Sequence, residues 1–218
     1  MFSVAIDGPA GAGKSTLAKA AAAKLGFIYI DTGALYRTVT YAVKAGGVDI
    51  EDESAFKRLL ASIKIELEFI DGVQHVFLNG KDVSELIRTP EISASVSIVS
   101  AVPMCREFFL DFQRSLADKY NAIMDGRDIG TVVLPNAQVK IFLTASPEVR
   151  ADRRYKELLE KGHEVTYEEV LDSVIKRDDR DSNRETAPLK PADDAVLLDT
   201  SNLNFEESLE EIIKLIRG

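Results

Sequence analysis

The stretch of sequence that decides the fold reads Phe2-Ser3-Val4-Ala5-Ile6-Asp7-Gly8-Pro9-Ala10-Gly11-Ala12-Gly13-Lys14-Ser15. Residues 2–7 form a short apolar run of strand type, and residues 8–15 match G-x-x-x-x-G-K-[ST], the pattern of a phosphate-binding loop (P-loop). In such a loop the glycines allow a tight turn that points backbone N–H groups toward an anion at the start of the next helix. We therefore expect a nucleoside triphosphate here, with Lys14 reaching its β- and γ-phosphates and Ser15 offering its hydroxyl to Mg²⁺.

The composition limits the partners that the chain can have. With 218 residues, 45% of them hydrophobic, it can bury one substantial core. The formal charge of -9 argues against a general nucleic-acid binder, which needs an excess of Lys and Arg. No run approaches the ~20 apolar residues that span a bilayer, and the first residues enter a strand without a leader pattern. We expect a cytoplasmic monomer with no nucleic-acid or membrane partner.

Residues that often carry metal or nucleophilic chemistry are scarce. The one cysteine, Cys105, lies in a helical pattern with Met104 and two phenylalanines, so we expect it to pack in the core. His75 and His163 are far apart in the sequence and near no Ser or Cys pattern, which indicates surface positions. The pattern therefore predicts neither a zinc site nor a catalytic triad.

Short apolar segments alternate with helical ones along most of the chain. The expected strands are residues 2–7, 27–31, 122–125, 139–145 and 195–199. The expected helices are residues 15–25, 32–45, 52–63, 91–102, 103–120, one from 147, one from 167 toward 184, and 205–217. This alternation predicts an α/β fold, a five-stranded parallel sheet with helices on both faces and a ligand at its carboxyl edge.

One segment departs from that pattern. Residues 63–69 alternate apolar and charged side chains, Asp71-Gly72 turns the chain into residues 73–78, and Asn79-Gly80 makes a second turn. Alternation of period two with two such turns predicts a small antiparallel sheet that is exposed on one face. We interpret it as a separate lobe inserted into the α/β core.

Two groups of arginines occur late in the chain. Arg150, Arg153 and Arg154 stand at i, i+3 and i+4, and Arg177, Arg180 and Arg184 stand at i, i+3 and i+7, with Asp181 beside them. On helices, each group would present several guanidinium groups on one face, as a compact anionic ligand needs. The alternative is a solvated face of ion pairs, for which Glu157, Asp178 and Asp179 are available.

Asp125-Gly126-Arg127-Asp128 follows the third core strand, where the floor of a ligand crevice is expected. Asp125 could order water around Mg²⁺, and Arg127 could form two parallel hydrogen bonds to a phosphate. The alternative is a tight turn held by its own Asp and Gly.

Four segments together resemble the bacterial cytidylate kinases. They are the P-loop at 8–15, Asp31-Thr32-Gly33-Ala34-Leu35-Tyr36-Arg37, Asp125-Gly126-Arg127-Asp128-Ile129-Gly130-Thr131, and Arg177-Asp178-Asp179-Arg180-Asp181-Ser182-Asn183-Arg184. The resemblance implies a P-loop kinase core over residues 1–218, with a monophosphate-binding region carrying the small sheet at 63–88 and a helical lid at 147–165. It also implies transfer of a phosphoryl group from ATP to CMP or dCMP with Mg²⁺.

The resemblance implies roles for individual residues as well. ATP would contact Gly8, Pro9, Ala10, Gly11, Ala12, Gly13, Lys14, Ser15, Thr16 and Arg153. The CMP phosphate would be held by Arg37, Arg127 and Arg184 beside Thr32 and Tyr36, the cytosine by Ser97, Arg106 and Asp128, and the sugar by Arg177 and Asp181. Lys14, Arg127, Arg153 and Arg184 would be catalytic, and Ser15 and Asp125, through water, would hold the metal. Thr32 stands where some members have serine, and the hydroxyl remains.

Base chemistry supports this assignment from another direction. Cytosine presents an amino donor beside two acceptors, which a carboxylate paired with an arginine matches, whereas uracil would set a carbonyl against Asp128. Discrimination against UMP should therefore exceed ~10²-fold. Two other functions stay open on the residues alone: a P-loop kinase of a small hydroxylated metabolite, and a nucleotide-dependent switch. The chain has no Asn-Lys-x-Asp guanine-reading motif, which disfavours a GTPase.

Overall fold

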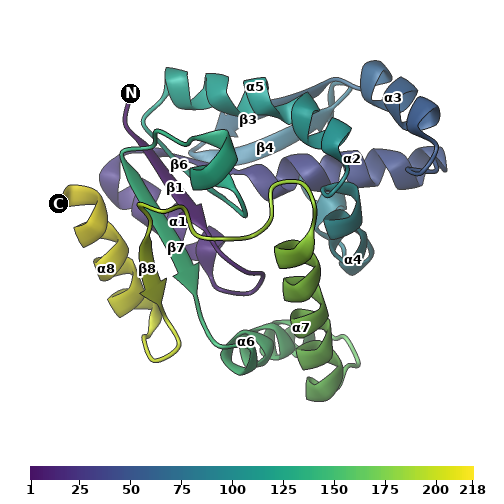
Figure 1. The fold of residues 1–218 in the computed structure, drawn as a ribbon. Coiled ribbons are helices and arrows are strands. Elements are labelled where there is room, and N and C mark those ends of the chain that lie inside the picture. The colour runs from purple at the N-terminus through teal and green to yellow at the C-terminus, as the bar shows by residue number, and fades with distance from the viewer.

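The computed structural model describes residues 1–218, and its centre is a parallel sheet (Figure 1). The strands are β1 (Ser3–Asp7), β2 (Ile28–Asp31), β6 (Ala122–Gly126), β7 (Val139–Thr144) and β8 (Val196–Asp199), in the order β2-β6-β1-β7-β8. All their pairings are parallel. The predicted five-stranded parallel sheet is thus confirmed.

Helices cover both faces of this sheet. Side chains alternate along β1, so Val4 and Ile6 face one side and Ala5 the other. Val4 and Ile6 belong to a core cluster with α1 (Lys14–Leu25) and α8 (Phe205–Arg217), the yellow helix beside β8 in Figure 1. Ala5 belongs to a second cluster, which includes residues of α5 (Pro103–Lys119). Apolar burial on both sides explains why the central strands β1 and β6 read as nearly continuous apolar runs.

The remaining helices form two further groups beside the sheet. Helices α2 (Thr32–Gly46), α3 (Glu53–Ser62) and α4 (Pro90–Val99) pack with α5 around Phe56 and Phe109. Cys105 is buried in this cluster, as predicted. Helices α6 (Pro147–Glu160) and α7 (Tyr167–Asn183) pack on each other and project below the sheet in Figure 1.

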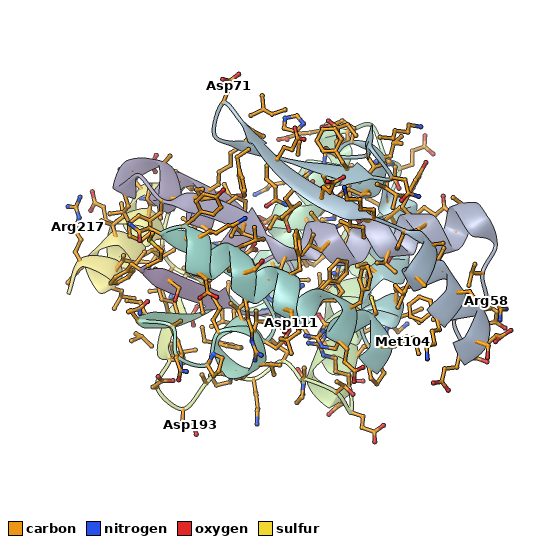
Figure 2. All side chains as sticks on the ribbon, turned by 90° about the horizontal axis from the view of Figure 1, so that it is seen from above. Arg58, Asp71, Met104, Asp111, Asp193 and Arg217 are labelled. Carbon is orange, nitrogen blue, oxygen red and sulfur yellow. The ribbon has the colours of Figure 1, made fainter.

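The predicted small sheet is present and has three strands. They are β3 (Ile65–Ile70), β4 (Val73–Leu78) and β5 (Lys81–Asp82), antiparallel in that order. Asp71 and Gly72 have φ of 52° and 75°, the left-handed pair that a two-residue hairpin turn needs. Figure 2 shows Asp71 at the exposed tip of this turn. Close to this turn, β4 is anchored to the large sheet, because Gln74 bonds both the N–H and the C=O of Asp31 at the end of β2.

Several boundaries differ from those predicted. Helix α4 ends at Val99 rather than at residue 102, and α7 ends at Asn183. Two short helical turns were not predicted: η1 (Leu86–Arg88) and the π-helical turn η2 (Ile129–Val133). Both depend on contacts with distant segments, which no local pattern records.

No single helix is long and apolar enough to cross a membrane. Helices α4 and α5 reach the required length and composition only as a pair, and they meet at an angle of 98°.

Candidate active site

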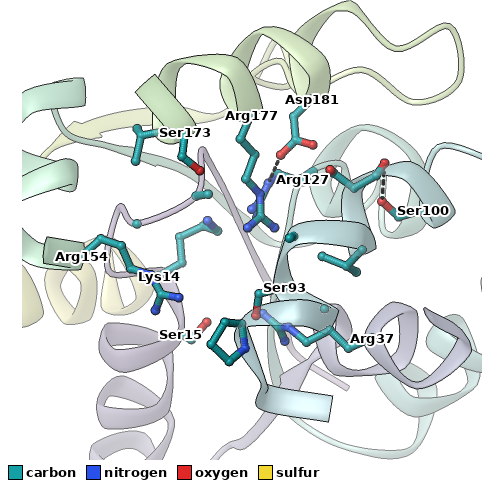
Figure 3. A pocket seen from close by; sticks show the side chains of 18 of the residues that line it. Lys14, Ser15, Arg37, Ser93, Ser100, Arg127, Arg154, Ser173, Arg177 and Asp181 are labelled. Atoms are coloured by element: carbon teal, nitrogen blue, oxygen red, sulfur yellow. Dashed lines mark hydrogen bonds and ion pairs between the residues drawn. The ribbon is translucent and has the colours of Figure 1, made fainter. Parts of the chain in front are cut away.

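A cavity of about 970 Å³ opens at the carboxyl edge of the parallel sheet, where β1, β2 and β6 end (Figure 3). The P-loop forms one wall, α2 and α4 form another, and the paired helices α6 and α7 lie opposite. Lys14, Arg37, Arg154 and Arg177 converge on this open space in Figure 3. Converging cations at a sheet edge suit a polyanionic ligand.

Most of the residues predicted from the sequence line this cavity. They are Ala10, Gly11, Gly13, Lys14, Ser15, Thr16, Thr32, Tyr36, Arg37, Ser97, Arg106, Asp125, Arg127, Asp128, Arg153, Arg177, Asp181 and Arg184. The P-loop residues Gly8, Pro9 and Ala12 lie behind its wall instead. Ala12 is fully buried, and a Cβ on Gly8 would lie 1.9 Å from the Leu143 carbonyl oxygen, so only glycine fits there.

Lys14 lies at the base of the cavity, where its positive charge is buried and close to that of Arg127. Its Nζ donates to the Pro9 carbonyl at 2.7 Å, which holds the ammonium within the curve of the P-loop. Burial, followed by the positive charge of Arg127, holds the pKa of Lys14 well below its ordinary value. A phosphate at this point would relieve both effects, since it supplies the missing negative charge.

Asp125 and Ser15 join β6 to the start of α1. Ser15 Oγ donates to Asp125 Oδ2 at 2.8 Å, and Tyr29 Oη donates to Asp125 Oδ1 at 2.8 Å. Burial, followed by the charge of Asp31, raises the pKa of Asp125. One hydroxyl and one carboxylate fit Mg²⁺, which keeps several waters and takes further oxygens from phosphates. No group of three His, Cys, Asp or Glu side chains lies close enough together to hold a metal ion.

Asp128 lies between two arginines on the other side of the cavity. It forms an ion pair with Arg106 of α5, and Arg184 Nη2 lies 3.4 Å from its second oxygen. Burial alone would lower the pKa of Arg106, but Asp128 outweighs it and raises that pKa. The Arg106 guanidinium also lies 5.3 Å from the centre of the Tyr36 ring. The result is a fixed row of alternating donors and acceptors.

A second acid–arginine pair joins the floor to α7. Arg127 Nε donates to Asp181 Oδ2 at 2.9 Å. Arg177 lies next to this pair, and burial, followed by the charge of Arg127, lowers its pKa to about 10. The Nε of Arg177 and the Nη1 of Arg37 are both buried without a hydrogen-bond partner. Arg37 Nη1 also lies 3.6 Å from Asp31 Oδ2, beyond hydrogen-bond distance. Buried donors without hydrogen bonds are rare, so both nitrogens are suited to an anion in the cavity.

The prediction that Arg150, Arg153 and Arg154 share one ligand-facing surface is wrong for Arg150. Its side chain is 3% exposed and points back into the protein. It donates to the Ala145 and Ala10 carbonyls at 2.8 and 3.0 Å and pairs with Asp178. Side chains in the first turn of a helix lean toward its N-terminus, which here abuts the P-loop.

The other two members of that group do line the cavity, and each also has a protein partner. Arg153 Nη2 donates to the Thr200 carbonyl at 3.0 Å, and Arg154 pairs with Glu157 at 2.7 Å. Arg184 departs from the predicted helical spacing, because it follows the end of α7 in an extended conformation with ψ of 141°. It reaches the cavity from the segment after the helix.

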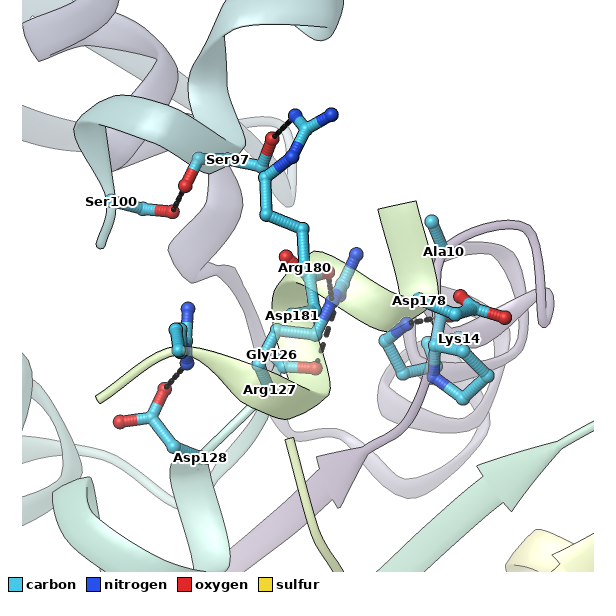
Figure 4. Close-up of polar contacts among 12 residues, drawn as sticks. Ala10, Lys14, Ser97, Ser100, Gly126, Arg127, Asp128, Asp178, Arg180 and Asp181 are labelled. Atoms are coloured by element: carbon cyan, nitrogen blue, oxygen red, sulfur yellow. Dashed lines mark hydrogen bonds and ion pairs between the residues drawn. The ribbon is translucent and has the colours of Figure 1, made fainter. Parts of the chain in front are cut away.

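Sequence reasoning missed three features that shape the site. Arg180 Nη1 donates to Ser97 Oγ at 2.6 Å and so links α7 to α4 (Figure 4). His163, expected at the surface, is half-buried at the cavity wall. Asp7 is buried and accepts two backbone N–H bonds from η2. The one signal in the sequence that could have identified Asp7 is a carboxylate at the end of an otherwise apolar strand, directly before a P-loop.

Comparisons with known proteins agree with this geometry. A family model described as cytidylate kinase matches residues 4–218. A cytidylate kinase from Carboxydothermus hydrogenoformans is 52% identical over 213 residues, which cover 98% of this chain and 96% of that one. One from Bacillus cereus is 51% identical over 217 residues, which cover 100% and 96%.

Solved structures show the same fold at much lower identity. A shikimate kinase from Bacteroides thetaiotaomicron aligns with a TM-score of 0.50 and 15% identity, over 100% of this chain and 99% of that one. This likeness concerns the fold alone. On the strength of the family model and the two relatives, the chain belongs to the cytidylate kinase family.

Proposed function

We propose that this protein transfers the γ-phosphoryl group of ATP to CMP or dCMP, giving ADP and CDP or dCDP. One observation carries the proposal: a P-loop and a carboxylate held between two arginines face the same cavity. The first suits a triphosphate and the second suits the hydrogen-bonding edge of cytosine. Family membership agrees with both halves.

The base is proposed to be read by Asp128, Arg106 and Ser97. The amino group of cytosine would donate to Asp128, and the acceptors N3 and O2 would receive donors from Arg106 and Ser97. Uracil presents a carbonyl where cytosine presents the amino group. It would leave the Asp128 carboxylate, which is 3% exposed, facing an acceptor.

The acceptor phosphate is proposed to lie among Arg37, Arg127 and Arg184, beside Thr32. The Nη1 of Arg37 supports this position: it lies 3.6 Å from Asp31 Oδ2 but has no hydrogen bond, which a phosphate oxygen would accept. Tyr36 would act through the Arg106 guanidinium that lies over its ring. Arg177 and Asp181 are proposed to hold the sugar between phosphate and base.

At the donor end, residues 8–16 are proposed to hold the ATP phosphates, with Arg153 above them. Ser15 directly, and Asp125 through water, would hold Mg²⁺. When bound, Mg²⁺ neutralises charge on the β- and γ-phosphate oxygens. Lys14 would neutralise the same oxygens from the protein side as an ammonium, and their negative charge would counter the lowering of its pKa by burial and Arg127.

In the proposed reaction, an oxygen of the CMP phosphate attacks the γ-phosphorus in line. The bond from that phosphorus to the β–γ bridging oxygen breaks, and ADP leaves with the bonding electrons. Lys14, Arg127, Arg153 and Arg184 would balance the charge that develops, and no covalent enzyme intermediate is required. Residues 147–165 are proposed as a lid that excludes water, and residues 63–88 as part of the monophosphate-binding region within a single domain.

An ADP-coupled assay with CMP, dCMP, UMP, AMP and GMP tests the proposal. CMP and dCMP should be phosphorylated at least ~10²-fold more efficiently than UMP, and ADP release without an acceptor should be slow. Lys14→Met, which keeps the length and loses the charge, should reduce CMP turnover ~10²- to 10³-fold. Preference for a hydroxylated metabolite over every nucleotide would overturn the proposal, as would full activity of Lys14→Met.

We propose that the protein works as a cytoplasmic monomer without a nucleic-acid or membrane partner. The formal charge of -9 supports the absence of a nucleic-acid partner. Size-exclusion chromatography with light scattering tests the monomer.

A further inference from the structure

A buried carboxylate outside the proposed contacts lies between the two halves of the site. Asp7 ends β1, directly before the P-loop, and is 4% exposed. Its Oδ1 accepts from the backbone N–H of Ile129 and its Oδ2 accepts from that of Gly130, each at 2.7 Å. These two N–H groups belong to the first turn of η2, which follows Asp128 in the chain.

The turn that Asp7 supports is an unusual one. In η2 the N–H of Val133 bonds the carbonyl of Asp128 at 3.2 Å, and that of Leu134 bonds the carbonyl of Ile129 at 2.6 Å. These are the i to i+5 bonds of a π-turn, which is rare and occurs mostly at functional sites. The first N–H groups of any helical turn lack partners within it and need a cap.

The residue that would normally provide this cap is Asp128, which stands at the N-cap position of η2. Aspartate is among the best N-cap residues, yet the Asp128 side chain makes no capping bond. Its carboxylate turns instead toward Arg106 and Arg184 at the cavity. The two orphan N–H groups of η2 are satisfied by Asp7, which is more than a hundred residues away in the chain.

We propose that Asp7 is a positioning residue for pyrimidine selectivity: by capping η2 in place of Asp128, it keeps the Asp128 carboxylate turned toward the base. The inference rests on the proposed function and names a residue that acts through Asp128 without touching substrate. If the cap were lost, Asp128 at the N-cap position would be placed to bond the orphan N–H groups itself. It would then have to divide its oxygens between capping η2 and reading the base.

The raised pKa of Asp7 makes asparagine a suitable substitution at this position. Burial raises the pKa of Asp7 to about 6, although its two backbone hydrogen bonds oppose the shift. A neutral side chain of the same shape is therefore tolerable at this position. In Asp7→Asn, the amide has one acceptor and one NH₂, so whichever way it turns, one of the two backbone N–H groups faces a donor.

The test is competition between CMP and UMP for the parent and Asp7→Asn. The ratio of the two kcat/KM values does not depend on the fraction of active enzyme, so simple loss of folded protein leaves it unchanged. The ratio should fall ~10-fold in Asp7→Asn, with a larger change in the KM for CMP than in the KM for ATP. A ratio within about twofold of the parent value, beside a lowered melting temperature, would show a structural role only and overturn the proposal.

A second variant, Gly130→Ala, changes the donor of the hydrogen bond between the Gly130 N–H and Asp7 Oδ2. A Cβ on Gly130 would lie 3.3 Å from Asp7 Oδ2 and 3.2 Å from Lys140 Cδ, so Gly130→Ala should displace the cap and lower the ratio in the same direction. If Asp7→Asn does not fold, an unchanged ratio in Gly130→Ala overturns the proposal.

Asp52→Asn is the matched control, because it makes the same change at the exposed cap of α3 and should leave the ratio unchanged. A parent enzyme without CMP preference would instead contradict the proposed function.

Discussion

Arg127 and Asp181 form an ion pair at 2.9 Å that joins the end of β6 to α7 across 54 residues of sequence. Burial would raise the pKa of Asp181, but the charges of Arg127 and Arg177 outweigh it and hold that pKa below its ordinary value. The pair therefore stabilises the folded protein above the ordinary pKa of aspartate, and this contribution is lost as the pH falls through the lowered value. It also fixes the direction of the Arg127 guanidinium.

Asp181→Asn should weaken both the fold and the binding of CMP. The substitution keeps the shape of the side chain but leaves Arg127 and Arg177 without their anion, at a cost of about 3 kcal/mol. Denaturant unfolding at neutral pH and the KM for CMP measure the two effects. Asp179→Asn, on the exposed side of α7, is the control and should change neither. Equal stability of the two variants would contradict the prediction.

Asp128→Ala should narrow the preference for CMP over UMP. The substitution removes the acceptor for the cytosine amino group and leaves Arg106 and Arg184 free to donate to a uracil carbonyl. The expected fall is ~10-fold or more in the kcat/KM ratio, mostly through slower use of CMP. Competition assays with both nucleotides provide the measurement. Unchanged selectivity would remove Asp128 from base reading.

Ser15→Ala should raise the concentration of Mg²⁺ needed for half-maximal activity. Its hydroxyl is the one direct oxygen ligand proposed for the metal, and its loss also frees the Asp125 oxygen that it now bonds at 2.8 Å. A shift of ~10-fold in the Mg²⁺ titration is expected. Ser15→Thr retains the hydroxyl and should restore the parent curve. The prediction fails if Ser15→Ala and Ser15→Thr need the same Mg²⁺ concentration for half-maximal activity.

Arg150→Met should destabilise the protein and weaken ATP binding together. It removes donors from the Ala10 and Ala145 carbonyls and leaves Asp178 without its buried partner, which costs about 3–5 kcal/mol. Adding Asp178→Asn should recover part of that loss. Lys156→Met breaks an exposed ion pair on the same helix and should cost less than about 1 kcal/mol. Urea unfolding and the KM for ATP report the two consequences.

The stability of the parent relative to Asp7→Asn should depend on pH. The pKa of Asp7 is raised from 3.8 to about 6, so its contribution is fully present below 3.8 and is lost as the pH rises through 6. Between about pH 5 and pH 7.5 the parent should lose about 1.4 kcal/mol relative to the variant. Unfolding of both proteins across this range gives the difference directly. A parent that gains stability relative to Asp7→Asn as the pH rises would contradict the prediction.

The elements predicted correctly from the sequence are those with local causes. The P-loop, the five apolar strands and the turns at Asp71-Gly72 and Asn79-Gly80 each follow from residues close together in the chain. The same is true of the capping box at Thr166, in which the hydroxyl accepts the N–H of Glu169 and the Glu169 carboxylate bonds back. Periodicity and cap chemistry depend on residues a few positions apart, so both can be predicted from the sequence.

The contacts that could not be predicted are those made at long range. Arg150 had the spacing of a ligand-facing residue, but the loop it meets, at Ala10, is 140 positions away in the chain. The π-turn η2 depends on Asp7, and no pattern within residues 129–133 indicates it. Arg184 fell outside its helix because α7 ends one residue earlier. For Arg150 and for η2, a distant partner outweighs the local preference.

By itself, the sequence determined the phosphate-binding loop, the strand and helix pattern and the supply of arginines and carboxylates, because these are properties of neighbouring residues. Only the tertiary structure decided which arginine pairs with which acid: Arg106 with Asp128, Arg127 with Asp181, Arg150 with Asp178. A guanidinium has several possible partners within a sequence, and the choice depends on which carboxylate the packed helices bring within hydrogen-bond distance and out of water.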